Sequence, residues 1–242
     1  MISSEHSVEQ LLLYNRFLGP VLDRFHLHQS SHPLRLDAWK AGNVPDLGFL
    51  TEILKAFDDI EGFDAALLQS YPIPVVLDYL YRTHDYYRGQ RFNELEQSVE
   101  RLIRSHSPRY PIFLLLAPVF HHFKQQLFRH IEEEEIRLFP YISYVFLQAT
   151  YGKVYAQRCF PGLLPCTLSD FAHSHEDHRS EEALEVLISR IREENPDKSI
   201  SLEVSIFLTQ LEALQNDLHI HERVENEVLL PVAMRLEGLT KS

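Results

Sequence analysis

Two segments of the chain place a histidine and a glutamate four residues apart and continue in the same pattern. His130 opens HIEEEEIRLFP and His221 opens HERVENEVLLP. In both segments a glutamate follows after four residues (Glu134, Glu225), a leucine after eight and a proline after ten. Residues four apart lie on one face of a helix, so each segment directs an imidazole and a carboxylate to the same side. Such pairs are typical of metal ligands.

Both pairs fall on the apolar stripe of their expected helices. One stripe runs through Val204, Phe207, Leu211, Leu214, Leu218, His221, Glu225, Val228 and Val232. The other runs through Phe123, Leu127, His130, Glu134, Leu138 and Tyr141, and His84 lies on a third, with Leu77, Leu80 and Tyr87. Burying an unpaired carboxylate is costly, and no lysine or arginine lies on these stripes beside the pairs. The pattern therefore predicts a bound cation; hydrogen-bonded core histidines in a metal-free helical scaffold are the alternative.

A fourth ligand position is expected in the segment HSHEDH, because a site inside a helical bundle takes a ligand from each helix. His175 is favoured because Phe171 lies four residues before it, and His178 is the second choice. The apolar stripe farther along the helix is in better phase with His173. All three histidines therefore stay open, with His175 preferred.

The resulting ligand set contains four histidines and two glutamates: His84, His130, His175, His221, Glu134 and Glu225. This is more than one ion with open coordination can take, whereas two ions could each bind two imidazoles and share both carboxylates. Nitrogen-rich, carboxylate-bridged sites suit iron, with manganese or zinc as alternatives. Ferritin-like bundles use Glu-x-x-His spacing and mostly carboxylates. Here the order is His-x-x-x-Glu and imidazole dominates.

The elements that must position these residues are long amphipathic helices. Apolar residues recur at helical spacing almost throughout, and four long helices are expected near 73–105, 118–150, 167–193 and 199–235. Prolines and a loop rich in Gly, Pro and Cys separate them. The expected fold is all-α, with an antiparallel four-helix bundle over residues 71–237. Residues 1–65 would form a small helical N-terminal region.

Bulk properties narrow the function. The chain has 242 residues with a formal net charge of −12, which makes nucleic acid a poor partner. Its apolar runs are too short to span a bilayer, and the N-terminus does not read as a signal peptide. Cys159 and Cys166 fit no zinc or redox spacing, so two unpaired thiols are expected. Unpaired thiols suit a reducing compartment, and a cytoplasmic location is expected.

In the segments that contain the candidate ligands, the chain resembles the hemerythrin-like di-iron proteins that repair iron–sulfur clusters, known as the repair of iron centres family. The likeness covers about residues 71–235 and is carried by THDYYRGQRFNEL, HIEEEEIRLFP, SHEDH and DLHIHERVENEVLLP. The resemblance implies imidazole ligands at His84, His130, His175 and His221, bridging carboxylates at Glu134 and Glu225, and two oxo-bridged iron ions. Many family members carry an N-terminal domain with adjacent cysteines. The comparable stretch here, RFHLHQSSHPL, has none. Whether His26, His28 or His32 takes the place of the cysteines stays open, and exposed turn histidines are the favoured interpretation.

The function implied by the resemblance is iron–sulfur cluster repair or nitric oxide handling under nitrosative or oxidative stress. Expected partners are NO, O₂ and damaged iron–sulfur proteins, with a homodimer as a possible assembly. The alternative is a hemerythrin-like module that binds or senses O₂ or NO without turnover. No fused signalling domain is evident, which favours repair slightly over sensing. Storage or oxidase chemistry of the ferritin type is disfavoured by the ligand spacing.

Overall fold

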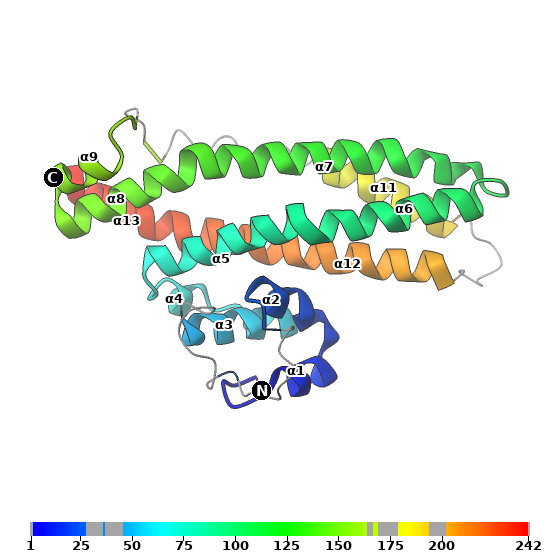
Figure 1. Ribbon diagram of the computed structural model, residues 1–242, viewed down its shortest axis with the longest axis horizontal. Coiled ribbons are helices and arrows are strands. Elements are labelled where there is room, and N and C mark those ends of the chain that lie inside the picture. Colours follow the sequence, from blue (N-terminus) through cyan, green and yellow to red (C-terminus); the bar gives the residue numbers. More distant parts are fainter. Residues whose placement is uncertain are drawn as a thin grey trace. The chain divides into compact units, whose positions relative to one another are not determined.

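A computed structural model describes residues 2–27, 36, 46–163, 167–168, 179–193 and 202–241 (Figure 1). Every regular element within these ranges is a helix, which confirms the expected all-α class for the described part of the chain. None of the described helices combines the length and the apolar character needed to cross a membrane. Cys159 is an exposed free thiol, as expected, and Cys166 lies outside the described residues.

The chain divides into two compact units. The first comprises Met1–Tyr86, Phe139–Leu168 and Asn216–Ser242, and the second comprises Tyr87–Leu138 and Ser169–Gln215. The boundaries at 86/87, 138/139 and 215/216 fall inside long helical runs. The predicted division into a small helical N-terminal region over residues 1–65 and a four-helix bundle over residues 71–237 stays a prediction.

The first unit begins with short helices set by side-chain caps. It contains α1 (Val8–Tyr14), η1 (Arg16–Leu18), α2 (Gly19–Arg24), α3 (Leu47–Asp58), η3 (Ile60–Gly62) and α4 (Ala65–Leu68). Ser7 and Gln10 form a capping box at the start of α1. The Asp46 and Asp64 carboxylates accept backbone N–H bonds at the starts of α3 and α4. These helices, α1 to α4, are called the N-terminal helices below.

Longer helices complete the first unit. They are α5 (Ile73–Tyr86), α8 (Phe139–Tyr151), the end of α12 (Leu202–Arg223), η7 (Val224–Leu229) and α13 (Leu230–Lys241), with α9 (Lys153–Cys159) beside α8. Helix α5 contacts α2, α8 and η7, so it links the N-terminal helices to the rest of the unit (Figure 1).

The second unit is built around aromatic packing. Its elements are η4 (Tyr87–Arg91), α6 (Phe92–His106), η5 (Pro111–Leu115), α7 (Leu116–Glu133), η6 (Glu134–Leu138), α11 (Arg179–Glu193) and most of α12. The Phe92 ring is fully buried, and its centroid lies 5.6 Å from that of Phe120 and 5.2 Å from that of Phe128. Ser98 donates to the Gln210 side chain at 2.7 Å, which ties α6 to α12.

Three of the four predicted long helices are present as long helical runs. Each contains one π-helical turn, namely η4 between α5 and α6, η6 between α7 and α8, and η7 between α12 and α13. The ends of the first two agree with the predicted 73–105 and 118–150 to within two residues, and the described part of the third spans 202–241 where 199–235 was predicted. Of the helix predicted over 167–193, α11 accounts for the last part, and residues 169–178 lie outside the described ranges.

Candidate metal centre

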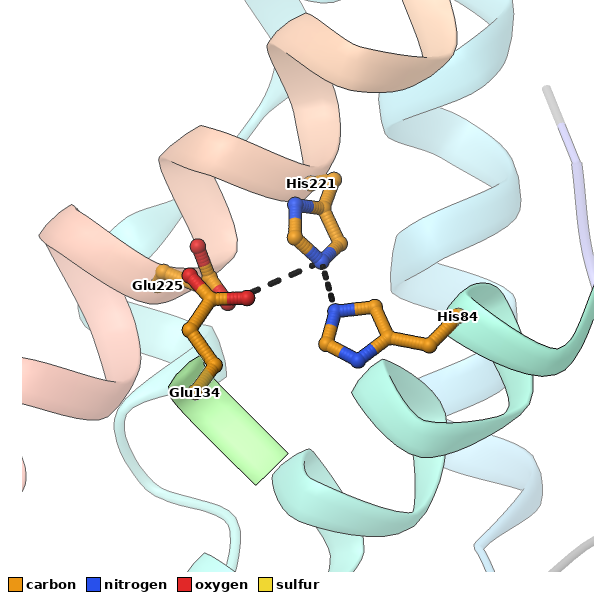
Figure 2. A group of neighbouring side chains, drawn as sticks. All are labelled: His84, Glu134, His221 and Glu225. Atoms are coloured by element: carbon orange, nitrogen blue, oxygen red, sulfur yellow. Dashed lines mark hydrogen bonds and ion pairs between the residues drawn. The ribbon is translucent and has the colours of Figure 1, made fainter. Parts of the chain in front are cut away.

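Four of the six predicted ligands come together in one buried group. His84, Glu134, His221 and Glu225 each offer one ligand atom, and these four atoms all lie within 4.8 Å of one another (Figure 2). All four residues are buried, with His84 fully excluded from solvent. A compact set of two imidazoles and two carboxylates is a typical transition-metal donor set.

Each of the four residues lies within one helical turn of a π-helical turn. His84 is in the last turn of α5, three residues before η4, and His221 is in the last turn of α12. Glu134 is the first residue of η6, and Glu225 is the second residue of η7. A π-helical turn accommodates one extra residue in a helix and is often found at functional sites. The three π-helical turns therefore lie where a change in helix phase can bring the four ligand atoms together.

The two histidines meet through their outer nitrogens. His84 Nε2 lies 2.9 Å from His221 Nε2, and His221 Nε2 lies 3.6 Å from Glu225 Oε1. The His84 ring stacks on Phe139, with centroids 5.5 Å apart and planes at 12°, which fixes its orientation. Two nitrogens bound to one ion at about 2.1 Å and at right angles would lie about 3.0 Å apart. The observed separation of the two nitrogens matches that requirement.

The charges of the buried residues also indicate a bound metal cation. Glu134 and Glu225 keep only 2% and 5% of their surface exposed, and a buried carboxylate needs a positive partner. Two imidazolium ions are a poor solution, because two protonated Nε2 atoms 2.9 Å apart would repel each other. A divalent cation compensates both carboxylates and uses both imidazole lone pairs. The residues present therefore fit a bound metal.

His130 lies beside this group. Its Nε2 is 2.9 Å from the Glu134 Oε1 atom, and its side chain is about one-third exposed. The structure thus places the predicted His130–Glu134 pair in contact, although His130 is not one of the four clustered residues. The role of His130 as a ligand stays a prediction.

The remaining histidine predictions lie mostly outside the described residues. This applies to His173, His175 and His178, and also to His28 and His32. His26 is exposed in a turn after α2, with a φ of 56°, as expected for a surface histidine in that stretch.

Sequence reasoning missed a buried acidic residue next to the centre. The predicted stripe contained Leu218, but the structure buries Asp217 to 2% exposure and leaves Leu218 partly exposed. Asp217 precedes His221 by four residues and Glu225 by eight, and this i, i+4, i+8 spacing was the available signal. Its partner is Arg24 of α2, which no periodicity in the sequence singles out.

No match was found in a scan against models of protein families, in a search of curated proteins or in a search of solved structures. The geometry of the buried group is therefore what supports an assignment of function.

Proposed function

We propose that this chain is a non-haem di-iron protein of the hemerythrin-like type, with its four long helices arranged as an antiparallel bundle. The observation that carries the proposal is the group of two imidazoles and two carboxylates, buried and with their ligand atoms within 4.8 Å. In this proposal Glu134 and Glu225 are shared between two ions. A histidine-rich, carboxylate-containing set suits iron, and manganese or zinc are alternatives at the same residues.

His130 and His175 complete the proposed ligand set. His130 contacts the Glu134 carboxylate, with its Nε2 atom 2.9 Å from Oε1, which places it beside the clustered residues. His175 precedes α11 by four residues, and we assign it on the sequence alone. With these two residues each ion would have two imidazoles.

The proposed role is repair of iron–sulfur clusters or handling of nitric oxide under nitrosative or oxidative stress. Iron bound at this site supplies an open coordination position for a diatomic ligand and a source of iron for a damaged cluster. The chain's own contribution is to exclude water, because all four clustered residues are buried, and to hold the imidazoles in fixed orientation. It resembles the repair of iron centres family in the segments that carry these residues.

The ligand assignment is tested by removing each carboxylate. Glu134→Leu and Glu225→Leu are expected to reduce iron from about two per chain to under a tenth of that value, because each change removes a shared ligand. Glu133→Leu and Glu222→Leu are the matched controls, since both residues are exposed neighbours on the same helices. Metal content is measured by elemental analysis after anaerobic loading, and helicity by circular dichroism. Full iron loading in both Glu134→Leu and Glu225→Leu would show that the ligands are elsewhere.

Repair and simple ligand binding are separated by turnover. Iron-loaded protein at substoichiometric amounts is expected to restore activity to an iron–sulfur enzyme previously inactivated by NO. Protein loaded with zinc provides the control, because zinc fills the site without redox chemistry. If the iron form binds NO or O₂ tightly but restores no activity, the alternative of a binding or sensing module replaces repair.

A further inference from the structure

One buried arginine of the N-terminal helices contacts both helices that carry the clustered histidines, through an ion pair with one helix and a hydrogen bond to the other. The Arg24 side chain, at the end of α2, is fully excluded from solvent and pairs with the nearly buried Asp217 carboxylate of α12. The same guanidinium donates through Nη1 to the Tyr79 hydroxyl of α5 at 3.2 Å. One arginine fork therefore holds α5 and α12 at once.

The two attachment points lie within two turns of the metal ligands. Asp217 precedes His221 by one helical turn, and Tyr79 precedes His84 by five residues. The guanidinium also lies over the rings of Tyr79 and Tyr86, at 5.8 and 5.1 Å from their centroids, and Tyr86 follows His84 by two residues. Arg24 thus touches α5 on both sides of His84 along the chain.

A second contact links the N-terminal helices to the π-helical turn that carries Glu225. Gln69, which ends α4, donates from Nε2 to the backbone carbonyl of Glu227 in η7 at 2.6 Å. Arg235 of α13 donates to the Gln69 Oε1 atom at 3.0 Å, which fixes the direction of the amide. The N-terminal helices therefore reach both α12 and η7, the elements that present His221 and Glu225.

A buried ion pair is poor support for stability alone. Removing an arginine and an aspartate from water is costly, and well-packed apolar residues of similar size often stabilise a protein at least as well. What an arginine fork adds is direction, because its planar donors fix both partners at once. Ligands to a metal depend on such orientation by groups around them.

We propose that Arg24 is a positioning residue of the metal centre, which sets the spacing of His84 and His221 through Tyr79 and Asp217. The N-terminal helices are then a structural part of the centre and not a separate module. This inference rests on the proposed metal site, and it gives the cysteine-free N-terminal region a role that needs no cysteine. Arg24 and Asp217, which are substituted in the test below, are not among the proposed metal ligands.

The test uses the full chain and a spectroscopic metal. Cobalt(II) is titrated anaerobically into the wild type, Arg24→Met, Arg24→Lys and the double variant Arg24→Met/Asp217→Leu. The double variant removes the ion pair without leaving a buried unpaired aspartate, so it should stay folded even if Arg24→Met does not. Ile53→Ala, in the buried face of α3, is the control that lowers stability away from the ion pair.

The double variant is expected to bind cobalt at least tenfold more weakly than the wild type and to change its visible ligand-field spectrum. Arg24→Lys should recover part of the affinity, because it keeps the charge but cannot hold Tyr79 and Asp217 with one fork. Ile53→Ala should keep the wild-type affinity and spectrum. A folded double variant with the affinity and spectrum of the wild type would overturn the role of Arg24.

Failure of the metal site itself gives a different result. If the wild type takes up no cobalt, zinc or iron, the proposed function fails, and the inference is judged from the metal-free proteins by amide hydrogen exchange. The double variant is then expected to exchange at least tenfold faster over residues 217–225 than Ile53→Ala of equal global stability. Equal exchange in that segment would overturn the positioning role.

Discussion

Tyr79 is a fully buried phenol whose oxygen accepts from Arg24, and its own carbonyl accepts from the Thr83 hydroxyl at 2.9 Å. Burial raises the pKa of Tyr79 to about 12, from an ordinary value of 10.0. The folded protein therefore keeps this proton at pH values where the unfolded chain loses it. At the scale of single residues, the buried polar groups near the histidines therefore include a neutral phenol, Tyr79, and the Arg24 side chain that donates to it.

This pKa predicts a specific loss of stability in alkali. Between pH 10 and 12 the unfolded chain binds fewer protons than the folded protein, so the free energy of unfolding falls as the pH rises. The contribution of Tyr79 is at most roughly 1 kcal/mol per pH unit in this window. Urea unfolding at pH 8 to 11 should show a weaker pH dependence for Tyr79→Phe than for the wild type. Tyr151→Phe, at an exposed site, is the control, and parallel curves for Tyr79→Phe and the wild type would refute the prediction.

The π-helical turns are the structural elements that distinguish this centre from an ordinary helical core. In η7, Val224, Glu225, Val228 and Leu229 are all buried, so Glu225 lies on the same buried face as three apolar residues. The extra residue lets the flanking helices keep their packing while the backbone around Glu225 is displaced. We therefore expect the turn to set the position of the Glu225 carboxylate.

Deleting the extra residue should weaken metal binding without unfolding the protein. Removal of Asn226, an exposed residue of η7, is expected to return this segment to regular α-helical hydrogen bonding. We expect unchanged helicity, an apo protein at least as stable as the wild type, and cobalt affinity reduced at least tenfold. Asn226→Ala keeps the chain length and serves as the control. Wild-type affinity in the deletion variant, measured by anaerobic titration, would show that the turn does not place Glu225.

The helices themselves could be predicted because long apolar stripes and prolines mark them, whereas the π-helical turns could not. A stripe drawn at 3.6 residues per turn passes through a π-helical turn without a visible break. It therefore placed His130 and Glu134 equally deep, while the structure leaves His130 one-third exposed beside a buried Glu134. Leu218 was expected where Asp217 is buried because both residues fit helical spacing between Leu214 and His221. The Arg24 contact could not be predicted, since it joins residues 193 positions apart.

At the scale of the whole molecule, the chain has a net charge of −12, and the described part of it buries three acidic residues that need cations, Glu134, Asp217 and Glu225. Glu134 and Glu225 are buried near two imidazoles, whereas the buried Asp217 is paired with Arg24. Only the first pair has a donor set that suits a metal. The free energy of unfolding should therefore be higher when the metal is bound.

Metal binding should raise the stability of the whole protein. A ligand that binds only the folded state stabilises it by about 2.7 kcal/mol at a free concentration of 100 times its Kd. We expect cobalt or ferrous iron at that concentration to raise the unfolding temperature of the wild type by several degrees, measured by scanning calorimetry. The Glu225→Leu variant should show no such rise, and an equal rise in both proteins would point to binding elsewhere.

The most direct test of the central claim is an anaerobic titration of the metal-free wild-type protein with ferrous iron, followed by X-ray absorption at the iron edge. A di-iron centre at these residues predicts saturation at about two iron ions per chain and an absorption spectrum with imidazole scattering and oxygen donors. The proposed site is wrong if the folded, metal-free protein takes up no stoichiometric iron, or binds it without imidazole scattering.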